Sequence, residues 1–219
     1  MFSFFKKNKV TINSFTIPQF GWERVEDTSS VLRLVNADQT IVIGKNFFEM
    51  RPDIPTVKDI ELLRRFFRDM LSDSNTGIVE VDIKQKNNLS FTSTIFKIPQ
   101  HESGMTYTGS LIFPFESCSF VLKVTAAESS PTGMREAIVG NKLLAKGEVN
   151  LTEKGIEGWA FDPYDSKVQS GVLMNKAEAP EYDDEFPDHP LSRVRKLMKQ
   201  IEDEVIWSPE VEKLKPFNK

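Results

Sequence analysis

The sequence predicts an α+β protein in which an antiparallel sheet of about seven strands packs with helices. Short segments of alternating apolar and polar residues follow one another closely, with turn-forming residues between them, as in a meander. Apolar stripes with helical spacing interrupt this series at a few points instead of following every strand, which does not fit a parallel βα arrangement. With 219 residues, 39% of them hydrophobic, the chain suffices for one large domain with an appended lobe.

The first predicted elements are three short strands and a helix. The strands are Phe15–Ile17, Val31–Val35 and Ile41–Phe48, separated by polar residues. Thr56, with Asp59 three residues further on, has the spacing of a capping box, so a helix is expected to begin after Thr56 and to end near the turn 72–77. Its buried side is expected to carry Val57, Ile60, Leu63, Phe67 and Met70.

Four further strands and a second helix follow. The strands are predicted at Val79–Lys84, Leu89–Pro99, Tyr107–Phe115 and Ser117–Glu128. Thr132 is expected to cap the helix, and Gly147 follows its last turn. Its common buried side is expected to carry Met134, Ile138 and either Leu143 or Leu144.

The sequence changes in character at about residue 148, which predicts a core domain over 1–148 and a C-terminal arm and helix over 149–219. The arm has no sustained period, but its aromatic residues are too many for a free linker, so we expect it to pack on the core. A third amphipathic helix is predicted from Pro190, and its buried side is expected to carry Leu191, Val194, either Leu197 or Met198, Ile201 and Val205. The last dozen residues are expected to form a loosely held tail.

The order of three strands, helix, four strands and helix resembles the PsbP-like fold over roughly residues 14–146. Phe15-Thr16-Ile17-Pro18 ahead of Trp22, and the later strand Ile41-Val42-Ile43, contribute to this resemblance. The group includes the Ran-binding Mog proteins, the DcrB proteins and the Eag chaperones of type VI secretion, and the resemblance implies an αβα sandwich. It also implies a non-enzymatic binding domain, because these groups are chaperones, adaptors and accessory factors. Segments 132–137 and 186–193 resemble those of uncharacterised bacterial proteins.

Residues for catalysis are scarce, because the chain has two histidines and one cysteine. This excludes disulfide frameworks and Cys/His zinc sites. Cys118 shares an apolar strand face with Phe120 and is expected in the core, His101 falls in a loop, and His189 falls at the probable N-cap of the third helix. Phosphate-binding glycine motifs and a nucleophile elbow are absent from the sequence. We therefore expect no catalytic residue, no cofactor and no metal site.

Charge points to a protein partner with a basic surface. The chain has 28 basic and 32 acidic residues, a formal net charge of −4, which does not favour nucleic acid. Its acids are densest in an acidic loop between Glu178 and Asp188 that contains no Lys or Arg. Whether this loop is solvated, holds a divalent cation or faces a basic protein stays open at this point. The predicted partner-binding residues are Trp159, Asp162, Tyr164, Asp165, Glu181, Tyr182, Asp183, Asp184, Glu185, Phe186, Asp188 and His189.

The N-terminus argues for a cytoplasmic protein. Phe2, Phe4 and Phe5 precede Lys6 and Lys7, which reverses the order of a secretory signal. No stretch reaches the roughly 18 uncharged apolar residues of a transmembrane helix, so no membrane span is expected.

These observations predict a non-enzymatic protein-binding module, most concretely a bacterial toxin-immunity protein or a secretion-system chaperone. In the immunity version, the acidic loop would imitate the phosphates of a toxin's substrate. The alternative is a carboxylate-based or metal-dependent hydrolase in which Asp162, Asp165 and the acidic loop hold a metal or act as acid and base. A third possibility is a structural subunit of a larger assembly.

Overall fold

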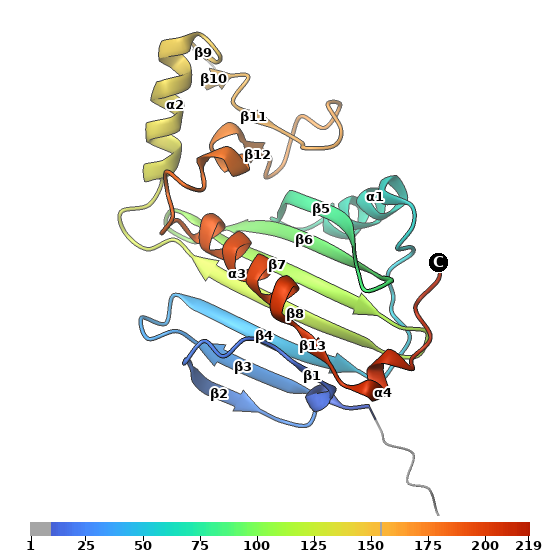
Figure 1. The fold of residues 1–219 in the computed structure, drawn as a ribbon. Helices are drawn as coiled ribbons and strands as arrows, with labels where there is room; N and C mark the ends of the chain where they lie inside the picture. The colour runs from blue at the N-terminus through green and yellow to red at the C-terminus, as the bar shows by residue number, and fades with distance from the viewer. Residues whose placement is uncertain (1–9, 154) are drawn as a thin grey trace, which may run out of the picture.

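The fold is built on a seven-stranded antiparallel sheet (Figure 1). The computed structural model describes residues 10–153 and 155–219, so the N-terminal segment that argues against secretion lies outside the described residues. The spatial order of the sheet is β2 (Glu23–Asp27), β3 (Val31–Val35), β4 (Ile41–Phe48), β8 (Ser119–Ala127), β7 (Met105–Pro114), β6 (Leu89–Pro99) and β5 (Gly77–Lys86). This confirms the predicted α+β class and the number of strands.

The membership of the sheet differs from the prediction at one strand. β1 (Phe15–Thr16) lies outside it and pairs with β13 (Ile206–Trp207) near the C-terminus. The seventh strand is instead β2, which the sequence pattern did not reveal, because four of its five residues are charged and it has one exposed edge. Charged residues on an edge strand discourage pairing with other chains, so this strand does not need an apolar alternation.

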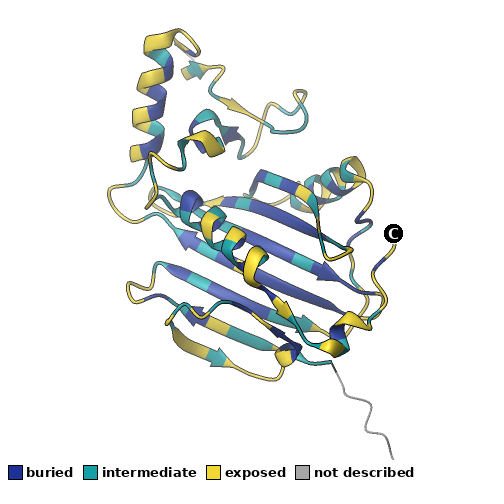
Figure 2. Cartoon of the chain, in the orientation of Figure 1, coloured by how far each residue is buried: buried dark blue, intermediate teal, exposed yellow. Residues whose placement is uncertain are grey.

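Helices cover both faces of the sheet. α3 (Pro190–Glu204) lies across β7 and β8, and its Leu191, Val194 and Ile201 are fully buried. A side chain at Gly109 of β7 would overlap the sulfur of Met198, so the glycine allows α3 to approach closely. On the other face, α1 (Ile60–Leu71) packs against β5, as Figure 2 shows by the buried strands between the two helices.

The first turns of two helices begin later than predicted. Asp59, not Thr56, is the N-cap of α1 and accepts a hydrogen bond from Leu62 N–H at 3.0 Å, whereas Thr56 holds the preceding turn. Thr132 does not cap α2 (Met134–Lys146), which begins after a left-handed Gly133. Two other predicted helix ends are confirmed. Gly147 is the left-handed C-cap of α2, and His189 is the N-cap of α3.

The buried side of α2 is turned by one residue from the predicted one. Its buried positions are Arg135, Val139, Gly140 and Leu143, so Leu143 is confirmed, whereas the predicted Met134 and Ile138 are exposed. A buried side inferred from apolar residues alone cannot contain an arginine, so the prediction assigned the neighbouring apolar positions to it. The burial of Arg135 is tolerated because its guanidinium group forms four hydrogen bonds, as described below.

α2 and the arm form a side lobe, residues 134–189, that stands away from the sheet (Figure 1). A small hydrophobic cluster holds the lobe together, with α2 on one side and the half-buried Trp159, Tyr182 and Phe186 on the other. The arm contributes β9 (Asn150–Thr152), β10 (Gly155–Glu157), β11 (Ala160–Phe161), β12 (Met174–Asn175) and the 3₁₀ turns η2 (Lys176–Glu178) and η3 (Pro180–Tyr182). The domain division at residue 148 stays a prediction, since α2 before it shares this cluster with the arm after it.

The C-terminal residues are docked, so the predicted loose tail is wrong. After the short helix α4 (Pro209–Glu212), the backbone N–H of Phe217 donates to Pro114 O, and Val57 N–H donates to Lys219 O at 2.9 Å. Val211 and Phe217 are buried. The sequence did not predict this docking, because a few widely spaced apolar residues in so short a segment form no periodic pattern.

We expect Phe217→Ala to lower the free energy of unfolding by about 2–4 kcal/mol, because it leaves a cavity in the cluster that joins the tail to α1. Urea denaturation followed by circular dichroism measures the loss. Phe48→Ala is the matched control, since Phe48 is 44% exposed and Phe217 is 5% exposed. Similar losses in the two variants would show that the tail does not contribute to the core.

Candidate functional site

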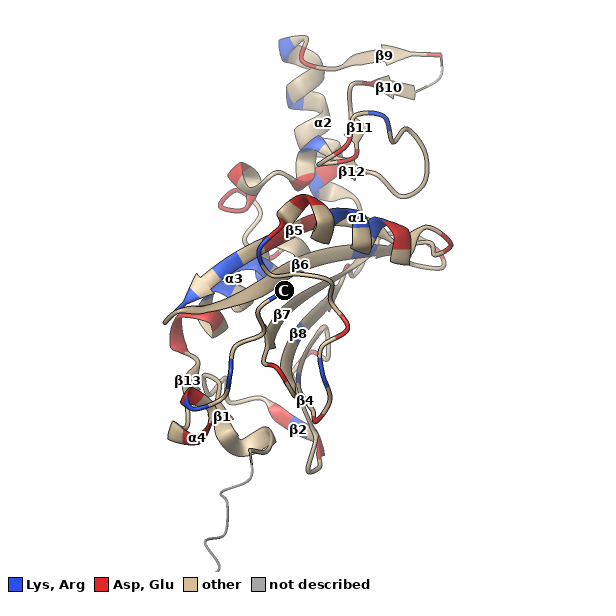
Figure 3. Cartoon of the chain, turned by 90° about the vertical axis from the view of Figure 1, so that its right-hand side faces the viewer, with Lys and Arg blue, Asp and Glu red and all other residues tan. Residues whose placement is uncertain are grey.

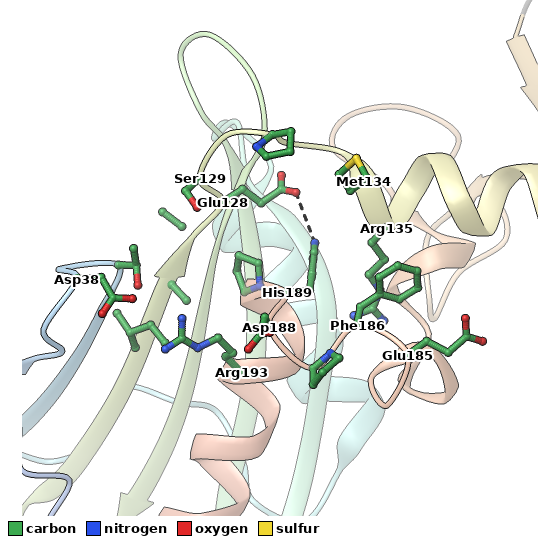
Figure 4. A pocket seen from close by; sticks show the side chains of 17 residues that line it. Asp38, Glu128, Ser129, Met134, Arg135, Glu185, Phe186, Asp188, His189 and Arg193 are labelled. Atoms are coloured by element: carbon green, nitrogen blue, oxygen red, sulfur yellow. Dashed lines mark ion pairs between the residues drawn. The ribbon is translucent and has the colours of Figure 1, made fainter.

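The candidate site is a cavity of about 580 Å³ where the end of β8, the start of α2 and the start of α3 meet (Figure 4). Four of the predicted binding residues line it, namely Glu185, Phe186, Asp188 and His189. Glu128, Arg135 and Arg193 line it as well. The volume lies within the usual range for small-ligand pockets and for the recesses that receive a partner's side chains.

His189 lies beside two carboxylates at the inner side of this cavity. Its Nε2 is 3.5 Å from Glu128 Oε1 and 4.0 Å from Glu136 Oε1, and the His189 side chain is 8% exposed. Its Nδ1 accepts a hydrogen bond from Leu191 N–H at 3.3 Å, which is how it caps α3. Because Nδ1 is the acceptor, the neutral ring carries its proton on Nε2 and directs it toward the carboxylates.

The two carboxylates differ in their surroundings. Burial tends to raise the pKa of Glu128, but the adjacent imidazole of His189 and hydrogen bonds from the backbone N–H groups of Gly133 and Met105 outweigh it and lower that pKa. Burial raises the pKa of Glu136, whose Oε2 is buried without a hydrogen bond. Glu128 is therefore a fixed anion that joins two loops, and Glu136 is a carboxylate under a desolvation penalty.

The same three side chains have the spacing of a metal centre, since their ligand atoms lie within 4.8 Å of one another. Two carboxylates and one imidazole would suit zinc. A metal bound at Nε2 would, however, need the imidazole proton on Nδ1, where it would face the N–H of Leu191. The arrangement therefore fits an imidazole placed between two carboxylates at the junction of β8, α2 and α3 better than it fits a metal cage.

Glu136→Gln and Glu128→Gln are expected to change stability in opposite directions at neutral pH. The raised pKa of Glu136 means that its cost to the folded state is absent at low pH and develops as pH rises, so Glu136→Gln should raise the melting temperature at pH 7 more than at pH 4. Glu128→Gln should cost about 1–3 kcal/mol, because an amide cannot accept both backbone N–H groups through two oxygens. Thermal melts across this pH range test both, and equal shifts for the two variants would contradict the assignment.

Half of the acids in the acidic loop are paired with basic residues of the same chain, two of them buried or half-buried and one exposed. Glu178 is fully buried, and its carboxylate accepts hydrogen bonds from Lys97 Nζ at 2.7 and 2.8 Å. Asp183 pairs with Arg135 and with Arg195, each at 3.0 Å. Glu185 forms an ion pair with Lys142. These contacts fix the course of the loop.

The other acids of the loop are exposed. Glu181, Asp184 and Asp188 have no hydrogen bond or ion pair from their side chains within the described part of the chain, and we call these three residues the acidic ridge. Acidic residues gather on the turns beside the base of α2 in Figure 3. Tyr182 and Phe186, which lie between them in the sequence, are half-buried against α2.

The remaining predicted residues are held elsewhere. Asp162 accepts a hydrogen bond from Arg68 of α1 at 2.7 Å and caps its own turn. The hydroxyl group of Tyr164 accepts from Val81 N–H of β5, and the Tyr164 ring lies 3.8 Å below the guanidinium of Arg64. Asp165 accepts from Lys167 N–H in the same turn. These residues do not line the cavity with His189, so the predicted carboxylate pairing with the acidic loop is not present in this arrangement.

Sequence reasoning did not find Glu128 or Glu136. One ends a strand and the other begins a helix, and the loop between them gives no periodic signal that would bring them together. Arg135 gave no signal either, because a single arginine in a helix usually marks its solvated face. Of the residues in this cluster, only His189 could be placed from the sequence, because it directly precedes Pro190.

The structure is that of an α+β protein with a sheet between helices and a side lobe, and the cavity lies where this lobe meets the sheet and α3. None of the helices in residues 10–153 and 155–219 combines the length and apolarity needed to span a membrane. No family model matches the sequence, and no curated protein matches it.

Several solved structures are similar in fold. The chain resembles a protein of Bacteroides thetaiotaomicron at 12% identity and a TM-score of 0.36, over 55% of this chain and 41% of that one. It resembles the PsbP protein CyanoP of Synechocystis at 9% identity and a TM-score of 0.38, over 61% and 85% of the two chains. It resembles the Ran-binding protein Mog1p of Saccharomyces cerevisiae at 10% identity and a TM-score of 0.40, over 59% and 78%. A PsbP protein and a Mog protein are thus among the similar structures, as the order of the predicted elements suggested, and the similarity is one of fold.

Proposed function

We propose that this chain is a non-enzymatic protein-binding module that presents its acidic ridge to a basic surface of a partner. The observation that carries this proposal is that Glu181, Asp184 and Asp188 are exposed and unpaired among the described residues, although the same loop is clamped by internal ion pairs. Unpaired acids on a fixed backbone favour a basic partner through complementary charge.

Rigidity strengthens the proposal. Asp183 lies directly beside Asp184 in the sequence, and it is held by two arginines, Arg135 from α2 and Arg195 from α3. The ridge therefore does not need to be ordered when a partner binds, which would otherwise reduce affinity. A freely solvated loop would not direct its own acids against buried basic residues of the sheet and the helices.

Apolar surface beside the ridge would add affinity. Met134 lines the same cavity as Phe186 and Asp188, and both Met134 and Ile138, one turn further along α2, are exposed. Apolar and aromatic groups next to exposed charge are typical of protein interfaces.

In its most concrete form the proposal is a bacterial cytoplasmic toxin-immunity protein or secretion-system chaperone. In the immunity version the ridge imitates the phosphates of a toxin's substrate and closes its basic active site. The name Ran-binding belongs to Mog1p, whose fold is similar, and it agrees with a binding role for a protein of this shape.

The test compares two triple variants of the full chain with equal changes of charge. One neutralises the ridge, Glu181→Gln, Asp184→Asn and Asp188→Asn, and the control neutralises exposed acids elsewhere, Glu23→Gln, Asp53→Asn and Asp73→Asn. The wild-type chain first captures its partner from the source cell, and the purified partner is then titrated with each variant at low and at high salt.

We expect the ridge variant to bind about tenfold more weakly at low salt and to lose most of its salt dependence, while the control binds as wild type does. Equal binding by the two variants would reject the ridge as the interface. A chain that captures no protein in stoichiometric amount would reject the binding role itself.

A further inference from the structure

A second cavity lies on the opposite part of the sheet, between η1 (Ile12–Ser14) and β1 on one side and strands β2, β3 and β4 on the other. Its volume is about 540 Å³. Its wall combines apolar and polar side chains. The apolar ones include Phe15, Ile17, Phe20, Trp22, Leu32 and Leu34, and the polar ones are Asn13, Thr16, Gln19, Arg24, Asp27 and Lys45. It shares no lining residue with the cavity at His189.

A buried lysine faces this cavity. Lys45 occupies an inward position of β4 between Ile43 and Phe47, and it is 6% exposed. Its Nζ donates a hydrogen bond to Phe15 O at 2.6 Å and lies 4.3 Å from the centre of the Phe15 ring. An ammonium group has three donors, and buried charges in proteins are normally paired with an opposite charge.

No carboxylate among the described residues forms an ion pair with Lys45. The other charges on the cavity wall, Arg24 and Asp27, are largely exposed and pair with each other at 3.0 Å. Burial lowers the pKa of Lys45 to about 8, against an opposing effect of Asp27, so the ammonium form is under strain in the folded protein. The cavity therefore contains a buried ammonium group that forms no ion pair with the described residues.

Aromatic rings border the space around this charge. Phe20 and Trp22 are half-buried, with ring centres 5.3 Å apart and planes inclined at 40°. Such a pair offers ring faces and edges to a planar guest, and Trp22 adds a polar N–H. A cavity that combines aromatic rings with a buried ammonium group favours an amphipathic ion of opposite sign.

We propose that this cavity is a binding site for a small aromatic carboxylate, whose carboxylate pairs with Lys45 Nζ while its ring packs against Phe20 and Trp22. The site goes beyond the proposed function, because it uses no residue of the acidic ridge and needs no protein partner. The ligand completes the coordination of the ammonium group with charge-assisted hydrogen bonds, which are stronger than the neutral kind.

The test uses the full chain and naphthoate as the probe, with naphthalenemethanol as an uncharged analogue of similar size. Isothermal titration calorimetry should give one saturable site for naphthoate and an affinity at least about tenfold weaker for the alcohol. This comparison on the wild-type protein does not depend on the folding of any variant.

Lys45→Met should remove the difference in affinity between naphthoate and naphthalenemethanol. The variant is expected to fold, because it deletes a buried charge that has no carboxylate partner, and a thermal melt checks this. Lys123→Met is the matched control, since Lys123 is an exposed strand lysine. The control should bind naphthoate as wild type does.

The affinity for naphthoate should stay level up to about pH 8 and fall above it, because Lys45 loses its charge there. Absence of naphthoate binding would overturn the proposal. So would equal affinity for acid and alcohol, which would indicate an apolar cavity, or full binding by Lys45→Met, which would place the anion elsewhere.

Discussion

Replacing Arg135 by Met is expected to lower the free energy of unfolding by about 3–5 kcal/mol and to loosen the side lobe from α3. The guanidinium of Arg135 is fully buried at the centre of the contacts that hold the lobe. Its Nε donates to Ala177 O at 2.6 Å, and its terminal nitrogens donate to Ala179 O, Asp183 Oδ1 and Ser192 Oγ.

The physical reason for so large an effect is the set of acceptors that the substitution would leave unpaired. Methionine fills much of the same volume, so the loss should not come from a cavity. The carbonyl of the fully buried Ala177 would lose its partner, and a buried polar group without a hydrogen bond costs about 1–3 kcal/mol. Asp183 would keep Arg195, so the loop would retain one of its two clamps.

Urea denaturation measures the loss, and hydrogen exchange localises it. Amide protons of residues 134–189 should exchange faster in Arg135→Met, while those of β7 and β8 should change little. Arg65→Met is the control, because Arg65 lies exposed on α1, and it should cost less than about 0.5 kcal/mol. A uniform rise of exchange throughout the sheet would contradict a role confined to the lobe.

Arg135 also explains which parts of the structure the sequence could predict. The strands of the sheet alternate apolar and polar residues, and α3 has a complete apolar stripe behind Pro190, so these elements were predictable. The buried face of α2 was not, because its first position is a charged residue whose partners lie more than forty residues away in the arm. A pattern of apolar residues cannot detect a charge that is buried with its hydrogen bonds satisfied.

The strand lysines were closer to being predictable. Lys45 follows Ile41 and Ile43 at intervals of two residues, and Lys97 follows Phe91 and Ile95 on one face of β6, so both stand at inward positions of a largely apolar face. A lysine at such a position indicates either a buried partner or an unfilled site. Lys97 has a buried partner in Glu178, and Lys45 has none among the described residues, a difference that local sequence could not reveal.

Lys97→Met is expected to cost about 3–5 kcal/mol, because it leaves the Glu178 carboxylate buried without a counter-charge. Lys97 is 2% exposed on β6 and Glu178 is 0% exposed on η2, so their contact joins the sheet to the lobe. Glu178 would still accept from the Tyr107 hydroxyl group at 2.9 Å and from Asn175 N–H at 2.7 Å. Burial, reinforced by Glu178, raises the pKa of Tyr107, so that hydroxyl stays a donor but cannot supply a charge.

A double-mutant cycle with Glu178→Gln separates the pair from the packing around it. Glutamine can still accept from Tyr107 or Asn175, so the double variant Lys97→Met, Glu178→Gln should recover much of the loss, with an interaction energy of at least about 2 kcal/mol. Additive losses in the cycle would mean that Lys97 contributes through its aliphatic chain instead. Urea denaturation of the four proteins at neutral pH gives the cycle.

The contact between Lys97 and Glu178 also bears on the acidic loop. Since Glu178 anchors the turn from which the acidic loop continues, Lys97→Met should also mobilise the loop, and the ridge should then bind a basic partner more weakly although none of its three acids has been altered.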